Sequence, residues 1–201
     1  MRNVIRFFIG CAVLGLILST GGGATAGPLD EPGFVKAFSC STCHGFGGVS
    51  PSDTMPILAG MPPAYFKKAV QDYASGKRSS PEMGPYSKMV LEAGVDDVAA
   101  YFARQKFQPA VVKADAAAVA RGRAASSGCV ICHGQDGKGD LAKLIPSLAG
   151  QPPGYLRNQI MLFKSDQRSP GDDQLKAIKA IMKTISDEAA GDLAAYYSNL
   201  R

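Results

Sequence analysis

A five-residue pattern, Cys-x-x-Cys-His, occurs twice in this chain of 201 residues, at positions 40–44 and again at positions 129–133. The histidines of these patterns are the only two in the sequence, and the only other cysteine is Cys11. In such a pattern two thiols add across the vinyl groups of a haem, and the adjacent histidine reaches the iron. The chain is therefore predicted to carry two covalently bound haem c groups, held by Cys40, Cys43, His44, Cys129, Cys132 and His133.

Paired cysteines have two other common uses. In an oxidising compartment they form disulfides, and two Cys-x-x-Cys pairs can together bind one tetrahedral zinc ion. A disulfide framework does not explain why a histidine follows each second cysteine. A shared zinc site would leave both histidines redundant, so haem is the preferred interpretation of both patterns.

Residues 1–26 are predicted to be a cleaved signal peptide. Arg2 and Arg6 give a basic start, an apolar stretch follows at positions 7–18, and Ala-Thr-Ala precedes Gly27, which is the pattern of a secretory leader. Retention of the leader as a membrane anchor is the alternative, although the apolar stretch is shorter than the roughly 20 residues that span a bilayer. Cys11 lies in this leader and is expected to leave with it.

The charge balance says little about binding partners. The full chain has a formal charge of +5; without Arg2 and Arg6, the basic residues fall from 22 to 20 against 17 acidic ones, which leaves +3. No run of like charge is present, so binding to nucleic acid is not expected.

An internal repeat divides the chain into two similar halves. Leu-Ala-Gly-Met-Pro-Pro-Ala-Tyr at 58–65 recurs as Leu-Ala-Gly-Gln-Pro-Pro-Gly-Tyr at 148–155, and Val-Ala-Ala-Tyr-Phe at 98–102 recurs as Leu-Ala-Ala-Tyr-Tyr at 193–197. The order and spacing match those of the Cys-x-x-Cys-His patterns, apart from about five extra residues after Arg168. Two copies are too few for a solenoid. We therefore expect two tandem domains, residues 27–107 and 108–201.

Apolar spacing predicts an all-α fold with long loops. Helical periodicity is expected at 31–38, 65–74 and 94–105 in the first half and at 115–125, 155–164, 176–184 and 186–200 in the second, with Gly/Pro-rich loops at 45–56 and 134–146. Each half has about 80 residues, which is small for an independent apolar core. A covalently bound porphyrin would supply the missing apolar mass.

The chain resembles the diheme cytochromes c of the cytochrome c4 type and the cytochrome subunit of flavocytochrome c sulfide dehydrogenase. The resemblance covers nearly everything after the leader and is carried by the two Cys-x-x-Cys-His-Gly patterns, the Leu-Ala-Gly-x-Pro-Pro-x-Tyr repeats and the Ala-Ala-Tyr helices. It implies two class I cytochrome c domains, periplasmic haem attachment, and a histidine and a methionine on each iron. It also implies that the carbonyls of Pro56 and Pro146 accept a hydrogen bond from the haem histidines, although either proline could be an ordinary turn residue.

In the first half, the family's spacing places the axial methionine at Met83, eighteen residues before Tyr101. Met89 is the rival, and a methionine can also be flexible core filler. We favour Met83 because a loop flanked by Pro and Gly can direct its side chain toward the iron.

The second half departs from this pattern. Ile178 stands eighteen residues before Tyr196 and cannot ligate iron, and Met182 follows one helical turn later. Met182 is the predicted ligand; a lysine (Lys176 or Lys179) and a five-coordinate haem are the alternatives. Met161 is expected in the core.

The expected function is transfer of single electrons between redox proteins in the periplasm, with no catalytic residues in the chain. The alternative is the cytochrome subunit of a periplasmic dehydrogenase, whose flavin would lie on another polypeptide because this chain lacks a dinucleotide-binding pattern. A third hypothesis, an enzyme or gas binder with an open second haem, rests only on Ile178. A flavoprotein dehydrogenase and a terminal oxidase are candidate partners; membrane association is compatible with this role but not required.

Overall fold

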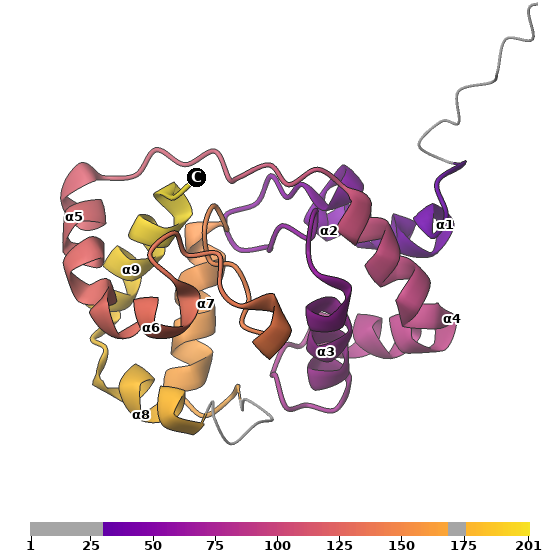
Figure 1. Cartoon of the computed structure of the whole chain (residues 1–201). Coiled ribbons are helices and arrows are strands. Elements are labelled where there is room, and N and C mark those ends of the chain that lie inside the picture. The colour runs from indigo at the N-terminus through magenta and orange to yellow at the C-terminus, as the bar shows by residue number, and fades with distance from the viewer. Residues whose placement is uncertain (1–29, 169–175) are drawn as a thin grey trace, which may run out of the picture.

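The computed structural model describes residues 30–168 and 176–201, so the predicted signal peptide lies outside the described residues. Within them every regular element is a helix, and the only β-type pairings are two isolated bridges, which confirms the all-α prediction. Figure 1 shows two lobes side by side, one of residues 30–104 and the other of residues 116–168 and 176–201, joined by an extended segment along one edge. In the described ranges, no helix is both long and apolar enough to cross a bilayer.

The first lobe is built around the packing of α4 against α1 and α3. Pro63 begins α3, where its missing N–H costs nothing because the first turn has no intrahelical acceptor for it. Buried Phe66 of α3 and Phe102 of α4 meet in the core at a ring distance of 5.7 Å. The helices of this lobe are α1 (Phe34–Ala37), α2 (Ser41–His44), α3 (Pro63–Ala74) and α4 (Met83–Arg104), with 3-10 turns η2 (Phe38–Cys40) and η3 (Phe46–Gly48).

The segment that begins at Met83 is helical, so the prediction of a loop around Met83 was wrong. The hydroxyl of Ser80 accepts a hydrogen bond of 3.0 Å from the Met83 N–H, which satisfies a donor that the first turn leaves free. Pro85 falls inside this first turn, where proline is tolerated. The helix bends at Gly94, whose φ of 104° and ψ of 85° are not helical, and the helix predicted at 94–105 corresponds to the part after this bend.

The second lobe repeats the plan, with α9 packed against α5 and α7. The carboxylate of Asp115 accepts from the N–H groups of Ala117 and Ala118, and Ser186 caps α9 through the N–H of Ala189, so both helices begin where side-chain caps were available. The helices are α5 (Ala116–Ala125), α6 (Val130–His133), α7 (Pro153–Lys164), α8 (Lys176–Thr184) and α9 (Asp187–Asn199), with 3-10 turns η4 (Ser126–Gly128) and η5 (Leu141–Lys143).

Equivalent hydrogen bonds show that the sequence repeat is also a structural repeat. The Gly60 N–H donates to the Phe102 carbonyl at 2.8 Å, and the Gly150 N–H donates to the Tyr197 carbonyl at 3.0 Å. In each lobe this bond ties the Leu-Ala-Gly turn to the last helix. The aromatic pairs of these helices, Tyr101 with Phe102 and Tyr196 with Tyr197, are buried in the two cores.

The lobes meet through a polar cluster of two arginines, two tyrosines and a glutamine. Arg78 donates to the hydroxyl of Tyr155 at 2.8 Å, and Arg168 donates to the hydroxyl of Tyr65 at 3.2 Å. Both guanidinium groups also donate to the Oε1 atom of Gln159. Each lobe therefore contributes one arginine that donates a hydrogen bond to a tyrosine of the other lobe.

Candidate haem-binding sites

Both Cys-x-x-Cys-His patterns adopt the same local structure, a 3-10 turn followed by one turn of α-helix that ends at the histidine. The glycine after each histidine stops the helix: Gly45 has φ 74° and ψ 164°, and Gly134 has φ 74° and ψ 166°. A Cβ atom on Gly45 would lie 2.1 Å from the carbonyl oxygen of Val49. This glycine is therefore needed both for its conformation and for close approach of the following loop.

His44 is buried, and its Nδ1 atom lies 2.8 Å from the carbonyl oxygen of Pro56. A carbonyl only accepts, so the proton must sit on Nδ1, which leaves the lone pair of Nε2 for a metal. Burial lowers the pKa of His44 and so favours the neutral imidazole that iron requires. The expected prolyl acceptor is confirmed here.

His133 repeats this arrangement in the second lobe. Its Nδ1 atom lies 3.0 Å from the carbonyl oxygen of Pro146, and burial lowers the pKa of the ring. Both histidines of the chain are thus held in the tautomer and charge state suited to ligating a metal through Nε2.

The first cysteine of each pattern lies beside the apolar core of its own lobe. Cys40 packs against the first core and Cys129 against the second, and burial raises the pKa of both thiols. The four cysteines of the two patterns are unpaired. The described part of the chain contains no group of three or more Cys, His, Asp or Glu residues that could hold a metal ion, so the structure does not bring the two patterns together as the zinc alternative requires.

A cavity of about 460 Å³ opens beside the second pattern, with Cys129, Cys132 and His133 in its wall. Most of its lining is apolar, and it also reaches first-lobe residues such as Tyr65 and Phe107. The apolar lining suits a largely apolar macrocycle such as haem. The two thiols and the imidazole in the wall are the groups that attach haem and bind its iron. The aliphatic lining of the cavity includes Leu144, Ile145, Leu148, Leu156, Ile160 and Leu193.

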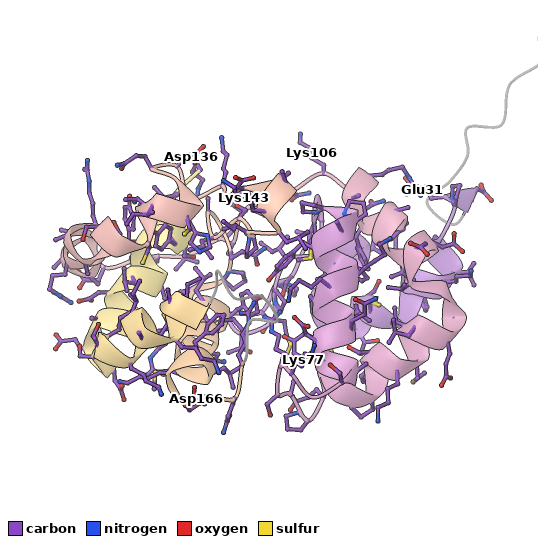
Figure 2. All side chains as sticks on the ribbon, turned by 60° about the horizontal axis from the view of Figure 1, so that its bottom comes forward. Glu31, Lys77, Lys106, Asp136, Lys143 and Asp166 are labelled. Carbon is purple, nitrogen blue, oxygen red and sulfur yellow. The ribbon has the colours of Figure 1, made fainter. Side chains whose placement is uncertain are left out.

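Met182 lines this same cavity from α8, together with Ile178 one turn earlier. The structure therefore brings Met182, His133 and the two cysteines to one space. The alternative Lys179 instead has its Nζ atom 3.3 Å from the carboxylate of Asp166, a residue labelled at the lower edge of the second lobe in Figure 2.

In the first lobe, Met83 is the first residue of α4 and is partly buried, whereas the rival Met89 is 58% exposed. A methionine that faces solvent is poorly placed to reach a buried group, which argues against Met89; Met83 stays the prediction for the first iron. Met161, expected in the core, is partly buried on α7.

Sequence reasoning gave no role to Arg168 or Gln151. Arg168 lines the cavity next to His133, and Gln151 is buried against the first lobe. The only sequence signal for Gln151 was the difference between the repeats, since Met61 occupies its place in the first half.

Known proteins share both the sequence and the architecture. The cytochrome c family model matches residues 119–201. Cytochrome c4 of Pseudomonas aeruginosa is 32% identical over 177 residues, which cover 84% of this chain and 87% of that protein. The thiosulfate dehydrogenase electron acceptor of Stutzerimonas stutzeri is 30% identical over 175 residues, covering 82% and 80%.

A solved structure agrees with these sequence relatives. Reduced recombinant cytochrome c4 from Pseudomonas stutzeri superimposes with a TM-score of 0.73 at 27% identity, covering 84% of this chain and 97% of that one. The expected fold of two tandem class I cytochrome c domains is thereby confirmed. The chain belongs to the cytochrome c4 family of electron-transfer cytochromes.

Proposed function

We propose that this protein is a periplasmic cytochrome with two covalently bound haems, one in each of the domains 27–107 and 108–201, after removal of a signal peptide at 1–26. The observation that carries the proposal is the matched pair of histidines, one buried and one partly buried, each hydrogen-bonded to a prolyl carbonyl at the end of a Cys-x-x-Cys-His pattern. When bound, the haems supply the one-electron chemistry. A periplasmic dehydrogenase is the candidate electron donor, and a terminal oxidase is the candidate electron acceptor.

The residues that would hold the two haems divide by role. The thiols of each pattern would form the covalent links, and the neighbouring imidazole would bind iron through Nε2. Met83 and Met182 would complete the coordination, and a thioether sulfur raises the potential of the iron. The proposed set is Cys40, Cys43, His44 and Met83 in the first domain and Cys129, Cys132, His133 and Met182 in the second.

Arg168 would face a carboxylate of the second haem. It lines the cavity beside His133, and its guanidinium contacts in the described structure are with neutral groups, Tyr65 and Gln159. A partly buried cation among neutral groups is stabilised by a nearby anion, and haem carries two carboxylates.

A role as the dedicated electron acceptor of a dehydrogenase is the second candidate. The relative named as a thiosulfate dehydrogenase electron acceptor favours it, and no catalytic residue would then be needed in this chain. Purification of the native protein separates the candidates: a stable complex with a dehydrogenase supports the second, and a free monomer supports a shuttle.

The intact mass of the exported protein tests the haem content directly. We expect the mass of residues 27–201 plus two haem groups. A bare polypeptide, or one with a single haem, would contradict the proposal. Carbon monoxide added to the reduced protein tests the open-haem hypothesis, and we expect an unchanged spectrum because Met182 fills the sixth position.

A further inference from the structure

Gln151 of the second lobe forms two hydrogen bonds with one residue of the first lobe. Its Oε1 atom accepts from the N–H of Ile57 at 3.0 Å, and its Nε2 atom donates to the carbonyl of Ile57, also at 3.0 Å. Gln151 is 7% exposed and Ile57 is 1% exposed. Water cannot readily replace these bonds, so the side chain is held firmly against this one stretch of backbone.

The N–H of Ile57 belongs to the same peptide group as the carbonyl of Pro56. That carbonyl accepts the hydrogen bond from Nδ1 of His44 at 2.8 Å. The hydrogen bonds therefore run in series, from His44 to the peptide group and from the peptide group to Gln151. Bonds in such a series polarise one another, by about 10–30% per bond. A peptide whose N–H is engaged becomes a stronger acceptor at its oxygen.

The second lobe cannot receive the same support from the first. The residue equivalent to Gln151 in the first repeat is Met61, whose thioether offers neither an amide donor nor a comparable acceptor. The hydrogen bond between His133 and Pro146 is 3.0 Å long, against 2.8 Å for its counterpart. The two repeats are therefore alike at the Cys-x-x-Cys-His pattern. They differ in the side chain available to support the peptide group that accepts the hydrogen bond from the histidine.

We infer that Gln151 is a positioning residue that acts across the domain interface on His44 and lowers the reduction potential of the first haem relative to the second. A stronger bond at Nδ1 makes the imidazole more basic, and a more basic ligand stabilises ferric over ferrous iron. The inference rests on the proposed function, because it needs a haem on His44.

The test replaces Gln151 by methionine, the residue that the first repeat carries at this position. Labelling with [15N]histidine gives two Nδ1–H signals in the reduced holoprotein, since the chain has two histidines. We expect the signal of His44, assigned by its proximity to Pro56 and Ile57, to move upfield while that of His133 stays in place. In a redox titration the reduced-to-oxidised ratio of the first haem at fixed potential should rise about threefold, which is about 30 mV because tenfold is about 59 mV for one electron.

Two further variants separate this role from general loosening of the interface. Tyr155→Phe removes an acceptor of Arg78 at the same interface but leaves the hydrogen bonds of Gln151, so the His44 signal should not move. Gln151→Glu is the conservative variant. Burial favours its protonated form, in which one carboxyl oxygen accepts from the Ile57 N–H and the O–H donates to the Ile57 carbonyl, so the His44 signal should stay close to its place in the parent protein.

An unmoved His44 signal in Gln151→Met, or an equal upfield shift in Gln151→Glu, would overturn the inference. The intact mass of each variant distinguishes this failure from failure of the proposed function. A protein with two haems and an unmoved His44 signal refutes only the role of Gln151, whereas a missing haem refutes the cofactor assignment itself.

Discussion

The guanidinium of Arg78 donates a hydrogen bond of 2.8 Å to the hydroxyl of Tyr155 in the other lobe. Arg78 is only 3% exposed, and it also donates to Gln159 at 2.6 Å. Burial by itself would lower the pKa of Arg78, but the phenolic oxygens of the surrounding tyrosines together outweigh it, so the pKa is raised. A buried charge is costly unless it is hydrogen-bonded. Arg78 therefore favours the packing of the two lobes that places Tyr155 and Gln159 within its reach.

Replacing Arg78 by leucine should therefore destabilise the protein strongly. The hydroxyl of Tyr155 loses its buried donor, and hydrogen bonds to charged groups contribute about 1.5–3 kcal/mol each. We expect the free energy of unfolding in urea to fall by about 2–4 kcal/mol. Lys77→Leu is the matched control, because Lys77 is the neighbouring cation, is exposed and is visible in Figure 2; its effect should stay within about 0.5 kcal/mol. Equal effects of the two variants would contradict the assignment.

Arg121 and Asp192 give the second lobe a pH-dependent contact. Two hydrogen bonds of 2.8 Å join the guanidinium to the carboxylate, and they hold the pKa of Asp192 below its ordinary value. A lowered pKa in the folded state means that the contact stabilises the protein above about pH 4, the ordinary pKa of an aspartate. Its contribution is lost as the pH falls through the lowered value.

Arg121→Gln should consequently be less stable than the parent at neutral pH, and the difference should shrink at acidic pH. Urea unfolding at a series of pH values between neutrality and about pH 2.5 measures both proteins under identical conditions. A stability difference that stays constant over the whole range would show that Arg121 acts through packing rather than through the charge of Asp192.

Gly122 marks the close crossing of α5 and α9. A Cβ atom there would lie 2.0 Å from the carbonyl oxygen of Asp192 and 2.8 Å from Cβ of Tyr196. Because backbone cannot yield as a flexible side chain can, Gly122→Ala should cost about 2–4 kcal/mol, at or above the usual range for overpacking. Gly191→Ala on α9 is the control. A Cβ at Gly191 meets nothing within 4 Å, so this change should instead stabilise the helix by about 0.5–1 kcal/mol. Thermal unfolding distinguishes the two outcomes.

Met182→Leu should remove a ligand of the second iron without removing apolar volume from the cavity. We expect the near-infrared band from methionine bound to ferric haem to fall by about half, and carbon monoxide to bind the reduced variant. Met161→Leu makes the same chemical change on α7 and should leave the band intact. An undiminished band in Met182→Leu would refute Met182 as the ligand and leave the lysine and the five-coordinate haem as the alternatives.

Local patterns predicted most helices well. The helices α3, α7 and α9 begin within two residues of the expected positions. Pro63 and Pro153 are the first residues of α3 and α7, and Ser186 is the N-cap of α9. The helix at 83–93 was missed because Gly84 and Pro85 are typical of a loop. Its first turn tolerates both, and packing of α4 against α3 favours the helix.

The sequence by itself determined the two Cys-x-x-Cys-His patterns, the repeat that contains them and the helical class, because each of these depends on residues within one or two turns of chain. Only the tertiary structure decided how the halves meet. Arg78 and Tyr155 are 77 positions apart, and Gln151 and Ile57 are 94 apart. Periodicity tells which face of a helix is apolar, but not which polar side chain of the other lobe will lie against it. That pairing is fixed only when both lobes are folded and their buried polar groups must find partners.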